Sequence, residues 1–531
     1  MKKTNLPKHF FKRLSKIENV PSLNTRKAPS PPAILFVMIL TYFLIFSIFT
    51  LMRHYTFKTN AFDLGIYRQA LHTTLFEGKF FYETPDLYYT FTGSFFGVHF
   101  VPIIFLLLPL YYVFPMPETL LIFQSLIIAL PAIPIYYLSL FLSQKKNIAI
   151  SFAAFYLLNP FIHSLNTYDF HIESFLPLFS TLALYYFETK RWKRFVAFSV
   201  LVGMTIDFAA IISLFFGIYG FTRYSKSVLR LILRKKMAKE EYEAVVASFA
   251  VFVISVFLLF TAILVISHFG PIPLSSTGVN ALFSKLGSNY REIMVNIILE
   301  PWRLVDSFLY DAIYKLAYLS AMFLSVFCFA YYSPREIILC APWIGVTLLT
   351  TNGVLYQLGY QFSAFIIPFI MYASIHGVIK IQKHRELLVY KKISKAFVIV
   401  FIMGVFISPI SPIIYYFTNS VPYGGYPIPT NHTMLLSQAV SLIPKNASVL
   451  AQNHIFAHVS DRSNVYLWVP PNVTVDYAIA DITQRDYVTF HGINQSFQQQ
   501  FETLKNSKLY QILFEEDGII VLKKIGQGEV L

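Results

Sequence analysis

Apolar stretches long enough to cross a lipid bilayer recur along this chain, and they limit its possible folds more than any other feature. A membrane-spanning helix needs about 20 mainly apolar residues, and the first such run, Pro32 to Met52, contains no charged residue. Only 13% of the 531 residues are charged, about half the share found in ordinary soluble proteins. The sequence therefore predicts an α-helical polytopic membrane protein and excludes a soluble enzyme.

The distribution of charge and cysteine excludes two further classes of protein. The net charge is +15, but the Lys and Arg residues form short blocks between apolar segments and are not interleaved with base-stacking aromatic residues. No nucleic-acid partner is therefore expected. The two cysteines, Cys328 and Cys340, both lie in apolar segments, which excludes a disulfide framework and a cysteine-based zinc site.

Eleven membrane spans are predicted, with the N-terminus inside and the C-terminus outside. The run Phe100 to Phe114 is short and contains two prolines, so we interpret it as an interfacial or re-entrant helix of the first outer loop. The predicted spans are Pro32–Met52, Glu118–Leu142, Ile148–Ser164, Ser174–Phe187, Phe195–Met204, Phe208–Phe221, Ala244–Ser267, Leu316–Tyr332, Ile337–Thr350, Phe362–Ile379 and Ala396–Phe417.

The orientation follows from basic residues and from glycosylation motifs. Segments assigned to the inside hold 28 Lys and Arg, whereas the outside loops before residue 418 hold eight, as the positive-inside rule requires. All four Asn-x-Ser/Thr motifs follow residue 418, and such acceptors are usable only on the non-cytoplasmic side. We therefore expect a plasma-membrane protein with a cytoplasmic N-terminus. The motifs begin at Asn431, Asn446, Asn472 and Asn494.

Three parts of the chain are distinguished: a basic cytoplasmic segment, 1–32, a transmembrane domain, 33–417, and a small extracytoplasmic α/β domain, 418–531. Asp517-Gly518 in the last part is typical of a tight hairpin, and no phosphate-binding loop or nucleophile motif occurs there. Its expected strands are Ala447–Gln452, Val465–Trp468, Val475–Ala480, Leu509–Phe514 and Ile519–Leu522, and its expected helices are Thr430–Leu442 and Gln495–Lys505.

The candidate catalytic base is Asp63, an acidic residue of the first outer loop. It is an isolated carboxylate in an apolar setting, between Phe62 and Leu64. A carboxylate that can accept a proton is what general-base catalysis requires. The alternative is that Asp63 caps a short helix running from Leu64 to Phe76, and the two roles do not exclude each other.

Other ionisable residues at the predicted membrane face are candidates for a phosphate or metal site, because burying them is costly unless they pair or line a cavity. Asp169, His171 and Glu173 alternate, so in an extended loop their side chains would share one face and suit a divalent cation or a phosphate. A solvated loop is the alternative. The candidate donor- or phosphate-binding residues are His99, Asp169, His171 and Asp207, and the candidate metal ligands are Asp169, His171 and Asp207.

Several short stretches of the chain form a recognisable combination. They are Phe62-Asp63-Leu64-Gly65, Gln69-Ala70-Leu71, Val98–Pro102, Pro117–Leu120, Asp169–Glu173, Ile443–Ala451 and Val475–Ala478. Together they resemble an uncharacterised prokaryotic family of predicted multi-pass membrane proteins that is grouped with the GT-C glycosyltransferases. The resemblance implies a GT-C-like fold with an acidic first outer loop, interfacial helices and a lipid-linked sugar donor that enters from the bilayer.

The chain departs from this family at one place. Where the family usually has Lys-Glu-Asp, between two short spans, this chain has Thr205-Ile206-Asp207. Loss of the Lys and the Glu puts contacts between this loop and the donor phosphate in doubt, and it is compatible with a diverged or inactive member.

The expected function is that of an inverting glycosyltransferase, which moves a sugar from a polyprenyl-phosphate carrier to an acceptor glycan, lipid or glycoprotein on the outer face of the membrane. A divalent metal ion is a candidate cofactor. One rival is a transporter or flippase for a lipid-linked saccharide, although transport sites lie near the membrane midplane and these acids lie at its outer rim. The other rival is a non-catalytic scaffold whose tail binds a surface polymer.

Overall fold

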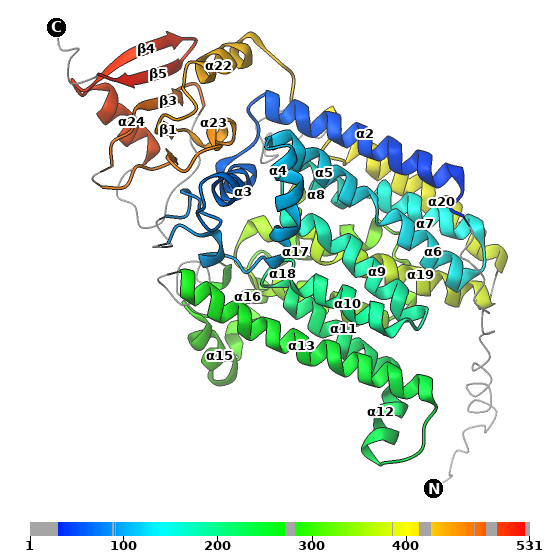
Figure 1. Cartoon of the computed structure of the whole chain (residues 1–531). Helices are drawn as coiled ribbons and strands as arrows, with labels where there is room; N and C mark the ends of the chain where they lie inside the picture. Colours follow the sequence, from blue (N-terminus) through cyan, green and yellow to red (C-terminus); the bar gives the residue numbers. More distant parts are fainter. Residues whose placement is uncertain are drawn as a thin grey trace, which may run out of the picture.

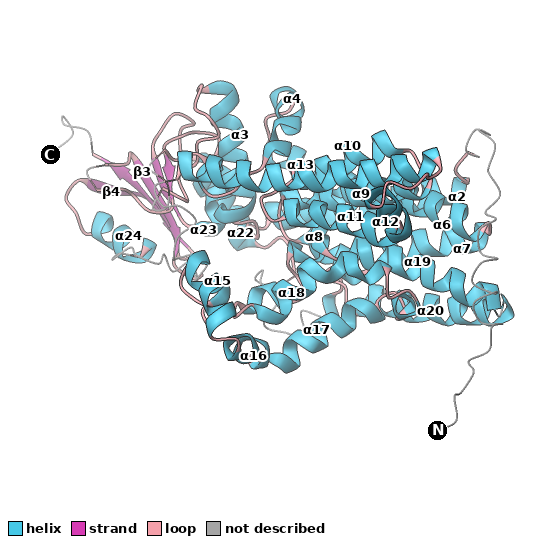
Figure 2. Ribbon diagram, turned by 90° about the horizontal axis from the view of Figure 1, so that it is seen from below, coloured by secondary structure: helices cyan, strands magenta, loops and turns pink. Residues whose placement is uncertain are grey.

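Helices make up most of the chain, and a five-stranded sheet follows them near the C-terminus. The computed structural model describes residues 30–87, 90, 92–270, 282–384, 386–413, 426–471, 473–484 and 496–525. Figure 1 shows the sheet at one end of the helical region, beside α3 (Ile66–Phe76), and Figure 2 shows the same separation from a second direction. The predicted domain boundary at residue 417 lies outside the described residues.

Three described helices are long and apolar enough to cross a membrane: α2 (Ala33–Tyr55), α13 (Lys239–Phe269) and the continuous unit Pro117–Ser143. A fourth is obtained if α7 (Lys146–Leu157) and α8 (Pro160–Thr167), which meet at a 43° bend, form one broken span. Both α2 and α13 expose many large apolar side chains, and only 28% of the apolar window of α13 is buried. Apolar faces of this extent are typical of helices that contact lipid or other proteins.

Each further apolar segment singled out in the sequence contains a helix, in several cases with a break. The predicted span Leu316–Tyr332 ends its α-helix at Leu324, because Phe327 and Cys328 adopt left-handed backbone conformations. The helices in these segments are α9 (Leu176–Glu188), α10 (Trp192–Gly203), α11 (Ala209–Arg223), α17 (Ala312–Leu324), α18 (Ala341–Leu349), α19 (Ile367–His384) and α20 (Glu386–Phe406).

Other helices bound the candidate site or lie where no element was predicted. Phe100–Phe114, predicted as one short helix, is a 3₁₀ stretch, Pro102–Leu107, followed by α4 (Leu108–Val113). The unit Pro117–Ser143 consists of α5 (Pro117–Ala129) and α6 (Ala132–Ser143), which meet at Pro131. The helices of the N-terminal part, before residue 418, that had no sequence prediction are α12 (Ser225–Ile232), α15 (Tyr290–Leu299) and α16 (Trp302–Leu309).

The C-terminal segment forms the small α/β module that the sequence predicted. Its strand order is β2-β1-β3-β5-β4, with β1 parallel to β2 and β3, and with β5 antiparallel to both β3 and β4. The strands are β1 (Val449–Ala451), β2 (Val465–Tyr466), β3 (Tyr477–Asp481), β4 (Tyr510–Glu516) and β5 (Ile519–Lys524). The helices are α22 (Asn431–Ser441), α23 (Asn453–Val459) and α24 (Phe497–Lys505).

Alternation along the strands builds an apolar layer on each face of this sheet. Val449 and Ile479 contribute to a cluster with α22 and α23, while Leu450 and Ala478 contribute to a second cluster with α24. The predicted hairpin is confirmed, since Asp517 and Gly518 both have positive φ, at 49° and 77°. Helix α23 had no sequence prediction.

Candidate functional site

Asp63 lies on a single π-helical turn, Ala61–Gly65, which connects α2 to α3. Such turns recur at functional sites in helical proteins. The expectation that Asp63 caps a helix is wrong, because no side chain caps either this turn or α3. Asp63 is only 8% exposed, and its carboxylate is directed to a residue on a distant loop.

That partner is His171. Its Nε2 donates to Asp63 Oδ1 at 3.0 Å, and its Nδ1 donates to the main-chain carbonyl of Tyr168 at 2.8 Å. The main-chain N–H of His171 donates to Gln124 Oε1 at 2.7 Å, which fixes the loop against α5. Because both ring nitrogens donate, the imidazole is a cation whenever Asp63 is ionised. The arrangement is a hydrogen-bonded carboxylate–imidazolium pair.

A second pair of the same kind joins His99 and Asp207. His99 Nδ1 donates to Asp207 Oδ1 at 3.0 Å, and the two side chains are 41% and 33% exposed. Burial opposes the charge on His99, but Asp207 outweighs it and raises the pKa of the imidazole. The lone acid between α10 and α11 therefore has a partner, supplied by the loop that precedes α4.

Asp169 has a different setting from the one expected. Its Oδ2 accepts the N–H of Asn60 at 2.7 Å, and Arg53 Nη2 lies 3.9 Å from its Oδ1. Its φ of 41° turns the loop, so the interpretation of an extended loop with Asp169 and His171 on one face is wrong. Burial, and secondly the charge of Asp63, raise the pKa of Asp169 to about 7. Asp169 supports the turn that carries Asp63.

A cavity of ≈260 Å³ brings several of these side chains together. Three of the residues predicted from the sequence line it: Asp63, His99 and His171. Asp207 does not line it but is hydrogen-bonded to His99. Asp169 is not among the lining residues. The remaining lining residues are Phe62, Ile66, Tyr67, Asp86, Phe95, Val98, Glu173, Ile206 and Gln361.

Three polar lining residues were absent from the predicted site. Asp86 and Glu173 stood in the acidic loops that the sequence singled out, so their position was a usable signal. Gln361 carried no such signal. Across the described ranges, no group of three or more His, Cys, Asp or Glu side chains is placed to hold a metal ion, and Asp169, His171 and Asp207 do not converge.

The C-terminal module packs directly behind the turn that carries Asp63. Asn453, the first residue of α23, accepts the N–H of Ala61 at 3.0 Å and donates to the side chain of Asn60, also at 3.0 Å. The ring of Phe456 fills the space beside Gly65, where a Cβ atom would lie 2.7 Å from the ring. Glycine at this position therefore permits the close approach of α23.

Polar contacts extend this interface along α3. Arg68 donates to the carbonyl of Ala457 at 2.7 Å and lies 3.3 Å from Asp461, and Gln69 donates to the carbonyl of Arg462 at 2.9 Å. The C-terminal module therefore supports the turn of Asp63 and helix α3 from behind, and it contributes no residue to the lining of the cavity.

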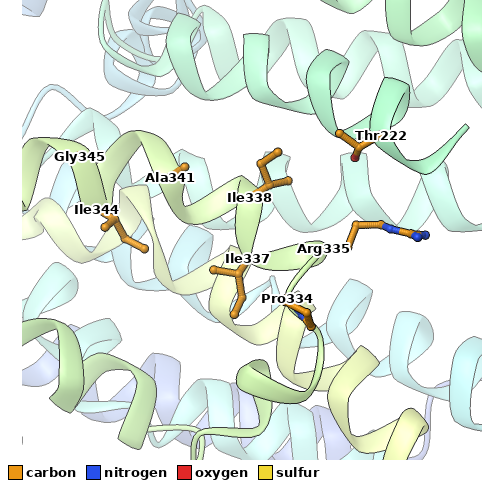
Figure 3. A pocket seen from close by; sticks show the side chains of 8 residues that line it. All are labelled: Thr222, Pro334, Arg335, Ile337, Ile338, Ala341, Ile344 and Gly345. Atoms are coloured by element: carbon orange, nitrogen blue, oxygen red, sulfur yellow. The ribbon is translucent and has the colours of Figure 1, made fainter. Parts of the chain in front are cut away.

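A larger hollow of ≈630 Å³ lies elsewhere, between α11 and the segment that leads into α18. Figure 3 shows isoleucine side chains along it and the Arg335 side chain extending away from them. Its eight lining residues include no acid and no histidine, so it lacks the groups for acid–base chemistry. The lining residues are Thr222, Pro334, Arg335, Ile337, Ile338, Ala341, Ile344 and Gly345.

The His171–Asp63 pair predicts a pH dependence of stability. Burial opposes the charged imidazole, but the hydrogen bond to Asp63 outweighs it and raises the pKa of His171 above its usual 6.5. The stabilisation is fully present below about pH 6.5 and is lost as the pH rises through the raised pKa. Denaturant titrations should show a larger fall in unfolding free energy over that window for the wild type than for His171→Gln. Equal falls in the unfolding free energy of the two proteins would show that the His171–Asp63 pair does not stabilise the fold.

The two aspartates in the loops should respond differently to substitution. Asp169 is 2% exposed and is the acceptor for the Asn60 N–H, so Asp169→Ala should cost about 1–3 kcal/mol of stability. Asp207 is a third exposed, so Asp207→Ala should leave stability within about 1 kcal/mol of the wild type. Thermal unfolding of both purified variants makes the comparison. An equal loss of stability would show that Asp169 has no special structural role.

Comparison with known proteins agrees with the membrane character of the helices. No curated protein matches the chain. The model of one family, described as "Predicted membrane protein (DUF2079)", matches residues 53–521, which include the turn at Asp63, the loop at His171 and nearly all of the C-terminal sheet. The chain therefore belongs to this family of predicted membrane proteins.

Proposed function

We propose that this protein is an inverting glycosyltransferase of the GT-C type, embedded in the plasma membrane, that moves a sugar from a polyprenyl-phosphate carrier to an acceptor on the outer face. The supporting observation is the Asp63–His171 pair at the wall of a small cavity that three further carboxyl or imidazole side chains line, Asp86, His99 and Glu173. Inversion needs one base and no nucleophilic carboxylate, and Asp63 supplies that base.

The proposed reaction is a single displacement. Asp63 takes the proton of the acceptor hydroxyl as the hydroxyl oxygen bonds to the anomeric carbon of the sugar. The bond from that carbon to the phosphate oxygen breaks, and the carrier phosphate leaves with the electron pair. The imidazolium groups of His171 and His99 lie at the same cavity and would stabilise the negative charge that develops on the phosphate.

The positions of Asp207 and Asp169 suggest supporting roles. Asp207 holds His99 charged and oriented, and Asp169 holds Asn60 at the start of the catalytic turn. Neither role depends on the Lys and Glu that the family usually places before Asp207. The departure at Thr205-Ile206 is therefore compatible with an active enzyme.

The direct test is an incubation of the purified full-length protein with a panel of radiolabelled polyprenyl-phosphate sugars and a membrane glycolipid fraction as acceptor. Consumption of one donor with transfer of label to the acceptor would support the proposal. Stable donors across the whole panel, with a folded protein, would contradict it. Uptake of an intact lipid-linked sugar across a proteoliposome membrane would favour the transporter instead.

The proposal also requires an orientation: eleven spans, a cytoplasmic N-terminus and an extracytoplasmic C-terminal module. The threefold excess of Lys and Arg in the segments assigned to the inside supports it. A membrane-impermeant thiol reagent added to intact cells should label Cys substitutions at Ser437 and Ser507 but not at Ser15. Both native cysteines are changed to Ala first. Labelling at Ser15 without labelling at Ser437 would reverse the topology and remove the proposed site from the outer face.

A further inference from the structure

The wall of the ≈260 Å³ cavity is rich in hydrogen-bond acceptors and in negative charge. Asp63, Asp86 and Glu173 all line it, and none of its twelve lining residues is Lys or Arg. The two histidines already direct a ring N–H to acids, His171 to Asp63 and His99 to Asp207. A ligand that donates hydrogen bonds and carries positive charge would complement this wall.

Glu173 is the side chain that most clearly lacks a partner. It is 4% exposed, and its Oε2 has no hydrogen-bond partner within the described part of the chain. It lies on a 3₁₀ turn, Ile172–Phe175, directly after the loop of His171. A second acceptor in the wall, Gln361 Oε1, is likewise buried and without a partner there. Burying a carboxylate without a partner costs free energy that a bound cation would recover.

Asp86 adds a second negative charge to the same wall. Its main-chain N–H donates to Glu83 Oε2 at 2.9 Å, which fixes the loop. Burial raises the pKa of Asp86 to about 6, so its carboxylate is mainly ionised at neutral pH. Two carboxylates, Asp86 and Glu173, are therefore available to a ligand without disturbing either histidine pair.

We infer that this cavity binds a sugar that carries a free ammonium group, with Glu173 as its main partner and Asp86 as the second. The inference rests on the proposed function and specifies its substrate class. The cavity is smaller than the roughly 300–1,000 Å³ of drug-sized ligand sites and suits one sugar residue. A neutral or N-acetylated sugar would bring no positive charge to Glu173, whose Oε2 accepts no hydrogen bond within the described residues.

The test is isothermal titration calorimetry of the full-length protein in detergent, with glucosamine, glucose and N-acetylglucosamine as probes, at a pH where the amine is protonated. Glucosamine should bind about ten-fold more tightly than either neutral sugar. Glu173→Gln, which keeps the size and removes the charge, should abolish that preference, and Asp86→Asn should reduce it. The matched control is Glu118→Gln, since Glu118 accepts from Tyr55 and does not line the cavity.

Three outcomes would overturn the inference: equal binding of the three sugars, a glucosamine preference that survives Glu173→Gln in a protein with unchanged thermal unfolding, or binding of Mg²⁺ alone with no binding of glucosamine. The calorimetric titration uses free sugars and no lipid-linked donor. A negative result in the transferase assay would therefore leave the conclusion about sugar binding unchanged. Conversely, transfer from neutral donors without any preference for glucosamine would overturn the inference and leave the proposed function standing.

Discussion

Replacing Asp63 by Asn should abolish turnover while the protein stays folded. Loss of a general base typically lowers the rate by about 10² to 10⁴, or roughly 3 to 5 kcal/mol of barrier. The substituted asparagine would keep the size of the side chain, and its carbonyl oxygen could still accept from His171 Nε2, so the pair would persist as a hydrogen bond. The measurement is initial rate with the donor identified in the panel assay, together with donor binding and thermal unfolding.

Asp306→Asn is the matched control, because Asp306 is an exposed acid on α16 that does not line the cavity. It should keep the wild-type rate. If Asp63→Asn instead keeps near-normal turnover, the base is another residue. Asp169, which the sequence alone would make the next candidate, does not line the cavity, so the acids Asp86 and Glu173 of the cavity wall replace it. A modest loss of thermal stability is expected, because the ion pair becomes a neutral hydrogen bond; if Asp63→Asn no longer folds, the role of the pair is structural.

Replacing Phe456 by Ala should lower both stability and turnover, although Phe456 does not line the cavity. The side chain is fully buried, and its ring fills the space against Gly65 of the turn that carries Asp63. Truncating a buried Phe to Ala typically costs about 3–5 kcal/mol. The turn would lose the surface that holds it, so Asp63 would no longer be fixed opposite His171. Denaturant unfolding measures the loss of stability, hydrogen exchange of residues 61–76 measures the loosening of the turn and α3, and the initial rate measures the loss of turnover.

Phe501→Ala is the control for Phe456→Ala. It distinguishes loss of the contact between α23 and the turn of Asp63 from a general loss of stability in the C-terminal module. Phe501 is 2% exposed, but it lies in α24 on the other face of the sheet and has no part in the contact with Gly65. Phe501→Ala should destabilise the module by about as much as Phe456→Ala does. Under conditions in which the module stays folded, it should leave the hydrogen exchange of residues 61–76 unchanged. If the two variants affect that segment and the rate equally, α23 does not position the turn.

Local signals in the sequence predicted most of the secondary structure, but not α12, α15, α16 and α23. Apolar runs predicted the helices because backbone groups in lipid must satisfy their hydrogen bonds within the helix. Alternation predicted the strands of the C-terminal module, and Asp517-Gly518 predicted its hairpin because both residues tolerate positive φ. Helix α23 was missed because its start, Gln452-Asn453-His454, follows a strand directly and has no apolar periodicity of its own.

The candidate site could be predicted only in part. The acidic loops singled out Asp63, His99, His171 and Asp207, since ionisable residues at a membrane face are costly without a role. Their pairing could not be predicted, because His171 lies 108 residues from Asp63, and His99 lies 108 residues from Asp207. Alternation suggested that Asp169 and His171 share a face, but the left-handed backbone at Asp169 separates them.

By itself the sequence determined the lipid-embedded helical class, the α/β module and the set of acids and histidines from which a site could be built. The tertiary structure decided which of them meet. It placed α23 against the turn of Asp63, through contacts such as that of Asn453 with Ala61, 392 residues apart. The physical reason is that periodicity and charge are local properties of the chain, whereas hydrogen-bonded pairs and cavities depend on how distant segments pack.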